Sequence, residues 1–190
     1  MDEALILKSI SSYIALTGDE KDYFIKLLDF KKIKAKKLLL KEGEVCKHSS
    51  FVIKGCLRGY AVDKNGFEHV MTFAPKGWWI ADMQSLLSQK PGTLNLEALQ
   101  DSELLMLSRK NQELLYNSIP KFERFFRVIA ENSLVSYQNR LMDNLSLTAR
   151  ERYLKFCTTY PGLIDKLPQK QVAAYIGVTP EFLSKMKKAI

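Results

Sequence analysis

Polar side chains that could bind a polyanion gather near the end of the sequence. Glu181, Ser184 and Lys185 fall on one face of an expected helix, and Lys188 follows one turn later. A carboxylate can accept a hydrogen bond from a base amino group, and an ammonium group can pair with phosphate or approach guanine. The candidate contact residues are Gln169, Lys170, Thr179, Pro180, Glu181, Ser184, Lys185 and Lys188. Two simpler interpretations stay open: the lysines are only solvated, and Glu181 pairs with Lys185 four residues later.

Two short helices with a tight turn between them are expected to position these side chains. The first helix is predicted to run from about Gln169 to Ile176, and Gly177 supplies the positive φ that the turn requires. Thr179 can cap a second helix and Pro180 suits its first position, so this helix should reach about Ala189. The apolar residues predicted to face inward are Val172, Ala173, Ile176, Leu183, Met186 and Ile190. This arrangement is typical of a helix-turn-helix, whose second helix enters the major groove of DNA.

The charge distribution favours the same kind of partner. The chain has 190 residues and a net charge of +8. Residues 144–190 alone contain eight basic and three acidic residues, a net +5 from a quarter of the chain. Such a concentration of positive charge around a presented helix favours a phosphate backbone. No apolar run approaches the ~18 residues of a membrane span, and the acidic start does not resemble a secretory signal, so a cytoplasmic protein without a membrane partner is expected.

Metal binding and catalysis are not supported by the residues that usually carry them. Cys46, Cys56 and Cys157 are scattered, and His48 and His69 are the two histidines. Neither a CxxC pair nor a Cys/His cluster is present, and we find no pattern for nucleophilic catalysis or phosphate cradling. We therefore expect no metal site, no cofactor and no enzymatic activity. A metal-dependent cupin, which is also a β roll, would need more histidines than these.

The first hundred residues indicate helices followed by a β domain. Residues 4–29 have helical periodicity, with a capping box at Thr17 and Glu20. Short apolar or alternating runs then recur between glycine turns, at 36–40, 51–53, 57–62, 69–73, 94–99 and 104–107. Asn65-Gly66 suits a two-residue hairpin turn. These strands predict a β sandwich, barrel or roll. The lysines of 31–41 suit an edge strand protected from aggregation, with a nucleic-acid contact as the alternative.

A long helix is predicted to begin after Pro120, because apolar residues then recur at helical spacing for more than twenty positions. Two apolar stripes run along it, so we expect one to cover the chain's own β domain and the other a second copy of the helix. The alternative is a helix buried inside one chain. The predicted dimer-helix residues are Phe122, Phe126, Ile129, Ser133, Leu134 and Leu141. A further helix to about Tyr160 should turn Tyr153, Leu154, Phe156 and Cys157 inward.

This order of elements resembles the Crp–Fnr family of bacterial transcription regulators. The segments 41–60, 65–83, 96–107 and 172–188 carry the resemblance. It implies an α+β fold with flanking helices and three parts. These are a cyclic-nucleotide-binding-like jelly roll at 1–116, a dimerisation helix at 117–145 and a helix-turn-helix domain at 146–190. The hairpin wing that often follows the second helix in such proteins is expected to be missing.

The resemblance also locates an effector pocket, and there the chain departs from the family. Members that bind cyclic nucleotides hold the ribose with a Gly-Glu-Leu segment and the phosphate with a later Arg-Ser-Ala segment. The corresponding residues here are Ala81-Asp82-Met83 and Gly92-Thr93-Leu94, so the candidate pocket residues are Asp82, Met83, Gly92 and Thr93. Gly92 cannot supply the cation, and a charged hydrogen bond of about 1.5–3 kcal/mol is lost. We therefore expect no familiar binding of cyclic AMP, with Lys90 as the alternative cation.

The leading hypothesis is a homodimeric regulator that binds an inverted-repeat DNA site. The resemblance implies RNA polymerase as a further partner, and an unidentified small-molecule effector is left open. The competing hypothesis is a ligand-sensing or protein-interaction module whose helix-turn-helix no longer contacts DNA.

Overall fold

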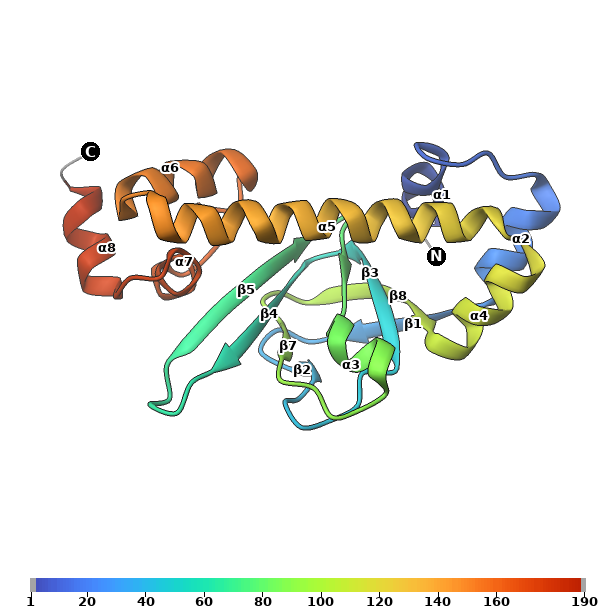
Figure 1. Ribbon diagram of the computed structural model, residues 1–190, viewed down its shortest axis with the longest axis horizontal. Helices are drawn as coiled ribbons and strands as arrows, with labels where there is room; N and C mark the ends of the chain where they lie inside the picture. Colours follow the sequence, from blue (N-terminus) through green and yellow to red (C-terminus); the bar gives the residue numbers. More distant parts are fainter. Residues whose placement is uncertain (1–2, 189–190) are drawn as a thin grey trace. The chain divides into compact units, whose positions relative to one another are not determined.

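The computed structural model describes residues 3–188, which form two compact units. The first unit contains the described residues up to Ala61 and Met71–Ile129, and the second contains Val62–Val70 and the described residues from Ala130 onward. The helices are α1 (Glu3–Ser11), α2 (Gly18–Lys26), α3 (Met83–Ser88), α4 (Arg109–Ser118), α5 (Lys121–Ser146), α6 (Ala149–Thr159), α7 (Gln169–Ile176) and α8 (Pro180–Lys187) (Figure 1). The strands are β1 (Leu28–Ile33), β2 (Leu38–Leu40), β3 (His48–Lys54), β4 (Cys56–Val62), β5 (Glu68–Pro75), β6 (Trp79–Ile80), β7 (Asn95–Ala98) and β8 (Ser102–Ser108). The three-part division at 116 and 145 stays a prediction.

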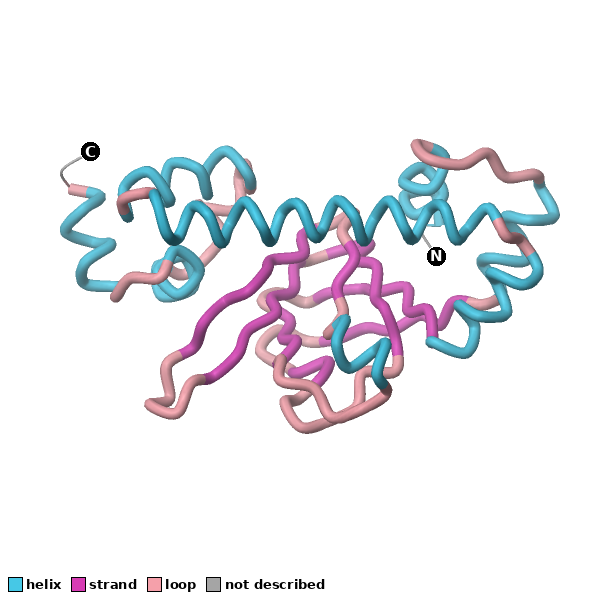
Figure 2. The backbone as a smooth tube through the Cα atoms, in the orientation of Figure 1, coloured by secondary structure: helices cyan, strands magenta, loops and turns pink. Residues whose placement is uncertain are grey.

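The strands form two four-stranded sheets, with orders β1-β8-β3-β6 and β2-β7-β4-β5 (Figure 2). The pairings β1·β8, β2·β7, β3·β6, β3·β8 and β4·β7 are antiparallel, for example with Phe51 opposite Leu105 and Gly59 opposite Leu96. The apolar residues of both sheets meet in one core, in which Val52 and Leu57 are fully buried. The predicted β roll is therefore confirmed, although the short strand β6 and the helices α3 and α4 were not predicted.

A second core joins the helices of the first unit to the β3-β8 side of the roll. Phe24 of α2 stacks on Phe122 of α5, with ring centroids 4.9 Å apart, and both rings are fully buried. Phe126 packs edge-on against Trp79. Phe122 is thus used inside its own chain and is not available for a dimer contact, which corrects its assignment to the dimer stripe. The predicted helical segment 4–29 is also too long, because α2 ends at Lys26 and the chain enters β1 at Leu28.

The capping box predicted at the start of α2 is confirmed. The Thr17 hydroxyl accepts from the Glu20 amide, and the Glu20 carboxylate accepts from the Thr17 amide at 2.7 Å. The same reciprocal pair, which was not predicted, starts α6 at Thr148 and Glu151. Both helices therefore begin where their side chains satisfy amides that the helix leaves unpaired.

The hairpin between β4 and β5 has a longer loop than the two-residue turn predicted. The amide of Asp63 donates to the Phe67 carbonyl at 3.0 Å, so Lys64, Asn65 and Gly66 form the loop. Only Gly66 among these three has a positive φ. The Asp63 carboxylate accepts from the amides of Asn65 and Phe67, which stabilises this three-residue loop over the Asn-Gly turn.

The helices of the second unit also differ in detail from the prediction. Phe156 of α6 is buried against Tyr160 and Tyr175, as expected of an inward face. Leu154 is 47 % exposed, however, so its predicted inward position is wrong. Among the described helices, none combines the length and apolarity needed to span a membrane.

Candidate nucleic-acid interface

The turn between α7 and α8 has the predicted geometry. α7 spans Gln169–Ile176, the range expected, and its apolar residues Val172, Ala173 and Ile176 are buried. Gly177 follows with φ +75°, and its amide donates to the Ala173 carbonyl. The amide of Val178 donates to the same carbonyl at 3.0 Å. The left-handed glycine thus ends α7 and lets the chain turn into α8 within the three residues 177–179.

α8 begins at a side-chain cap and is anchored by one apolar residue. The Thr179 hydroxyl accepts from the Phe182 amide at 3.2 Å, and Pro180 occupies the first turn. Leu183 is 1 % exposed and is the buried residue of this helix. α8 ends at Lys187, two residues earlier than predicted, and the predicted inner residue Ile190 lies outside the described residues.

The side opposite Leu183 is available to a partner. Glu181, Lys185 and Lys188 are exposed, and Ser184 is half-buried. No ion pair joins Glu181 to Lys185 in the described part of the chain, so the simple pairing of these two residues is not observed. Of the other candidates, Thr179, Gln169 and Lys170 are exposed and Pro180 is half-buried. Phe182 of α8 is 52 % exposed.

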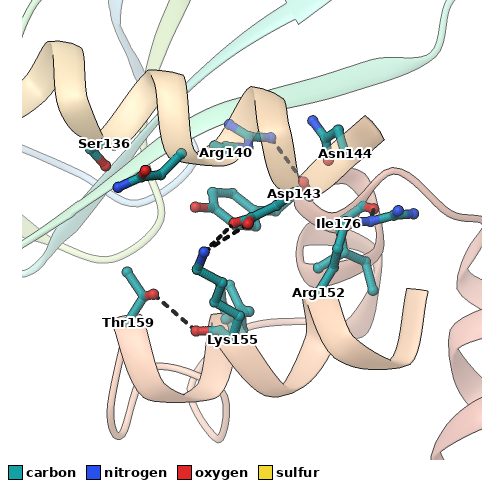
Figure 3. A pocket seen from close by; sticks show the side chains of 11 residues that line it. Ser136, Arg140, Asp143, Asn144, Arg152, Lys155, Thr159 and Ile176 are labelled. Carbon is teal, nitrogen blue, oxygen red and sulfur yellow. Dashed lines mark hydrogen bonds and ion pairs between the residues drawn. The ribbon is translucent and has the colours of Figure 1, made fainter. Parts of the chain in front are cut away.

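Two arginines whose contacts were not predicted from the sequence hold the C-terminal end of α7 (Figure 3). Arg152 of α6 donates through Nε to the Ile176 carbonyl at 2.9 Å and through Nη1 to the Leu147 carbonyl at 2.7 Å. Arg140 of α5 donates through Nη2 to the Tyr175 carbonyl at 2.8 Å and to the Val70 carbonyl at 2.6 Å. Cations at the negative end of a helix are favourable. The end of α7 that leads into α8 is therefore tied to both neighbouring helices.

Arg140 also lies over the Tyr175 ring, with its guanidinium carbon 4.0 Å from the centroid. Burial removes this guanidinium from water and lowers the pKa of Arg140. The sequence gives no local signal for these contacts. Arg152 binds a carbonyl 24 residues away, and Arg140 binds one 70 residues away.

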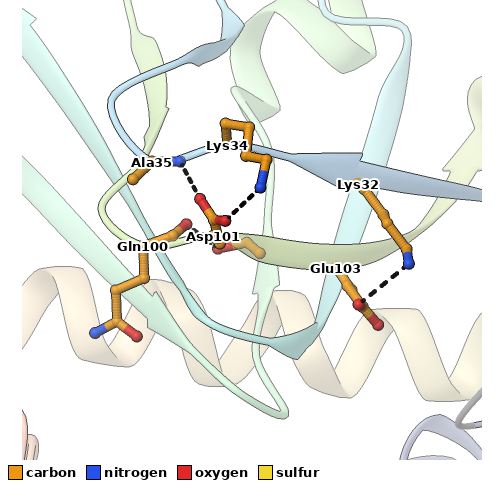
Figure 4. Close-up of polar contacts among 7 residues, drawn as sticks. Lys32, Lys34, Ala35, Gln100, Asp101 and Glu103 are labelled. Carbon is orange, nitrogen blue, oxygen red and sulfur yellow. Dashed lines mark hydrogen bonds and ion pairs between the residues drawn. The ribbon is translucent and has the colours of Figure 1, made fainter.

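The lysine-rich segment 31–41 does lie at a sheet edge, as predicted, because β1 pairs with β8 alone and ends the sheet. Lys34 binds Asp101 at 2.7 Å and Lys32 lies 3.7 Å from Glu103, as the dashed contacts in Figure 4 mark. Asp101 also accepts from the Ala35 amide. These exposed pairs contribute little to stability. They do neutralise part of the basic run, which favours the edge-strand interpretation over nucleic-acid contact.

Asp82, the residue expected to face an effector, is already occupied by its own chain. Its carboxylate is 2 % exposed and accepts from the Ser85 amide at 3.1 Å, capping α3. The second oxygen accepts from the amides of Thr93 and Leu94, both at 3.2 Å. A carboxylate shared among three amides has little remaining capacity to bind a ribose hydroxyl.

The absence of a side chain at Gly92 leaves space for the Asp82 carboxylate. A β-carbon built on Gly92 would lie 2.3 Å from Asp82 Oδ2 and 2.9 Å from the Ser85 β-carbon. Of the other two pocket candidates, Met83 is 48 % exposed, and Thr93 is exposed although its amide binds Asp82. Lys90 is exposed as well, and its carbonyl accepts from the Ser85 hydroxyl at 2.6 Å. Asp82 and Gly92 are therefore in direct contact, whereas a pocket formed by all four predicted residues stays a prediction.

Comparisons with known proteins agree with this fold. Residues 30–118 match the family model of the cyclic nucleotide-binding domain. The c-di-GMP-responsive global regulator CLP of Xanthomonas campestris has a similar structure, with a TM-score of 0.75, 13% identity and coverage of 91% of both chains. FixK2 from Bradyrhizobium japonicum has a TM-score of 0.73 and 18% identity, over 85% of this chain and 83% of that one.

A third similar structure is a transcriptional regulator of the Crp/Fnr family from Eubacterium rectale. Its TM-score is 0.73 at 13% identity, over 92% of this chain and 83% of that one. No curated protein sequence matches the chain significantly. Residues 30–118 therefore form a domain of the cyclic nucleotide-binding family, and the chain has the fold of the Crp–Fnr transcription regulators.

Proposed function

We propose that the protein is a DNA-binding transcription regulator of the Crp–Fnr type. The observation that carries this proposal is the orientation of α8. Leu183 is buried while Glu181 and Lys185 are exposed on a helix whose start is capped by Thr179. A helix anchored on one side and polar on the other is the form that enters a major groove.

The proposed contacts divide between phosphates and bases. Lys170, Lys188 and Gln169 lie at exposed positions suited to the backbone, where lysines give salt-sensitive affinity. Glu181, Ser184 and Lys185 are proposed to choose bases, each good contact deciding about 1–3 kcal/mol. Thr179 and Pro180 set the entry of α8 into the groove.

A homodimer is the proposed assembly, and the second half of α5 supports it. Leu134, Leu141 and Leu145 are 58 %, 60 % and 75 % exposed. Their spacing of seven and four residues matches the seam of a paired helix. Such large apolar residues along a single exposed helix are typical of an interface. Two α8 helices would then reach successive major grooves about 34 Å apart, so the DNA site is an inverted repeat.

Regulation by cyclic AMP in the familiar way is not part of the proposal. The internal bonds of Asp82 and the missing cation at Gly92 both disfavour a cyclic nucleotide in the roll. We propose that any effector is a different small molecule. RNA polymerase is the further partner that this class of function implies.

The test is selection of bound fragments from random duplex DNA with the full chain, followed by fluorescence anisotropy on the selected site. Lys185→Ala should relax preference at one base pair of each half-site, at a cost of about 1–3 kcal/mol. Lys170→Ala should instead weaken all sequences alike and reduce the salt slope by about one. Weak binding to every duplex, unchanged between low and high salt, would favour the sensor or interaction module without DNA contact.

A further inference from the structure

A polar cavity in the second unit lies where α5, α6 and α7 meet. Its volume is about 140 Å³. Figure 3 shows its charged lining: Arg140 and Asp143 from α5, and Arg152 and Lys155 from α6. Tyr175 of α7 forms an aromatic part of the wall. Its lining shares no residue with the exposed face of α8 or with the Asp82 loop, so neither site already described accounts for it.

The lining carries an excess of positive charge. Arg140, Arg152 and Lys155 oppose one carboxylate, that of Asp143, which leaves a net charge of +2. Lys155 holds Asp143 at 2.7 Å, so the carboxylate is already neutralised locally. Within the described chain, the partners of Arg152 are the carbonyls of Ile176 and Leu147. A guanidinium has five N–H donors, so these two bonds leave donors for a further acceptor.

The other groups suit a small acceptor-rich ligand. The amide side chains of Asn139 and Asn144 come from exposed positions of α5, and the hydroxyl of Thr159 comes from α6. The cavity volume is well below the ~300–1,000 Å³ of pockets for drug-sized ligands. This size favours one small oxyanion.

We propose that this cavity binds a small oxyanion of the phosphate or carboxylate class. Arg152 would hold it while keeping its bond to the end of α7, and the amide side chains of α5 would complete the contacts. Because the bound anion would contact side chains from two helices that grip α7, it would stabilise the second unit and the placement of the turn before α8. The proposal concerns ligand binding in the absence of DNA. A failure to bind phosphate would therefore not contradict the proposed DNA binding, and the reverse also holds.

The experiment is isothermal titration calorimetry of the full chain with inorganic phosphate, with sodium chloride at equal ionic strength as the reference. Asn144→Asp is isosteric, lies at an exposed position and adds a negative charge to the lining. It should weaken phosphate binding by roughly tenfold or more, because a like charge a few ångströms away is only partly screened. Asp143→Asn removes the one carboxylate and should strengthen binding several-fold on the same reasoning.

The matched control is Lys166→Gln, which removes a positive charge from an exposed position between α6 and α7, outside the cavity. Its phosphate affinity should stay within about twofold of the unmodified chain if long-range screening applies. Thermal unfolding of each variant checks that it is folded. The proposal is overturned if phosphate does not bind beyond chloride, or if Asn144→Asp and Lys166→Gln change the affinity equally. Sulfate and a small dicarboxylate, titrated in the same way, then distinguish the two ligand classes.

Discussion

Replacing Gly92 with alanine tests whether the loop after α3 is built around the Asp82 carboxylate. The backbone at Gly92 does not have a positive φ, so the added methyl group causes no intrinsic strain. It would, however, lie 2.3 Å from Asp82 Oδ2, and one of the two must move. The variant therefore probes a single steric relation between two residues ten positions apart.

The expected cost follows from what the carboxylate would lose. A shift of Asp82 breaks its bonds to the amides of Thr93 and Leu94, and a hydrogen bond to a charged group contributes about 1.5–3 kcal/mol. Overpacking of a tight site adds about 1–3 kcal/mol, and relaxation of the loop returns part of both. We expect the free energy of unfolding to fall by about 2–4 kcal/mol in total.

Urea unfolding followed by tryptophan fluorescence is the assay. Both tryptophans, Trp78 and Trp79, lie in the first unit with Gly92, so their signal reports on the unit that is altered. Gly18→Ala is the matched control, because Gly18 starts α2 and a β-carbon there meets nothing within 4 Å. Its stability should be unchanged or slightly raised.

The double variant Asp82→Ala with Gly92→Ala separates the clash from other effects. Asp82→Ala alone should destabilise the protein, since α3 loses its cap and two amides lose their acceptor. With the carboxylate gone, the further cost of Gly92→Ala should drop below about 1 kcal/mol, which is a coupling between neighbours. The reasoning is refuted if Gly92→Ala unfolds at the same urea concentration as Gly18→Ala, or if its cost is undiminished without Asp82.

Three further variants or reactions test other parts of the structure. Leu141→Glu places a charge on the proposed dimer seam and should shift the protein to monomers in sedimentation, and an unchanged dimer would argue for another interface. Burial raises the pKa of the Cys56 thiol to about 12, so about one molecule in ten thousand carries the reactive thiolate at pH 8, and alkylation of the native protein should modify Cys157 far faster than Cys56. Mass spectrometry of the peptides measures this, and equal labelling would contradict the burial of Cys56. Thr17→Ala removes the cap of α2 and should cost about 1 kcal/mol in urea unfolding, a loss that Thr17→Ser should avoid.

Those parts of the fold that could be predicted from the sequence depend on local signals. The range of α7, the left-handed Gly177 and the cap at Thr179 all involve residues within four positions of one another. Each of these signals acts through hydrogen bonds within its own segment. The local structure that it predicts therefore does not depend on contacts with distant residues. The recurrence of short strands predicted the β roll for the same reason.

The hairpin loop shows where a local signal fails. Asn65-Gly66 favours a two-residue turn, but the carboxylate of Asp63, two residues before Asn65, binds the amides of Asn65 and Phe67 and selects a longer loop. His69 then reaches the same carboxylate at 2.9 Å across the hairpin. The two-residue turn and the three-residue loop are alternative backbone arrangements of the same hairpin. The Asp63 carboxylate favours the three-residue loop.

The candidate sites depend on hydrogen bonds between residues that are far apart in the sequence, such as those of Asp82 and Arg152. Such contacts cannot be predicted from the neighbouring residues alone. From the sequence, Gly92 is a position that cannot supply the cation of a phosphate site. The structure gives the same glycine a second role, because a residue without a β-carbon is what admits the Asp82 carboxylate. Both roles oppose a phosphate site at this position. An arginine introduced at Gly92 would supply the cation, but its β-carbon would displace the Asp82 carboxylate. A single substitution therefore cannot restore a phosphate site here, and both Asp82 and Gly92 would have to change together.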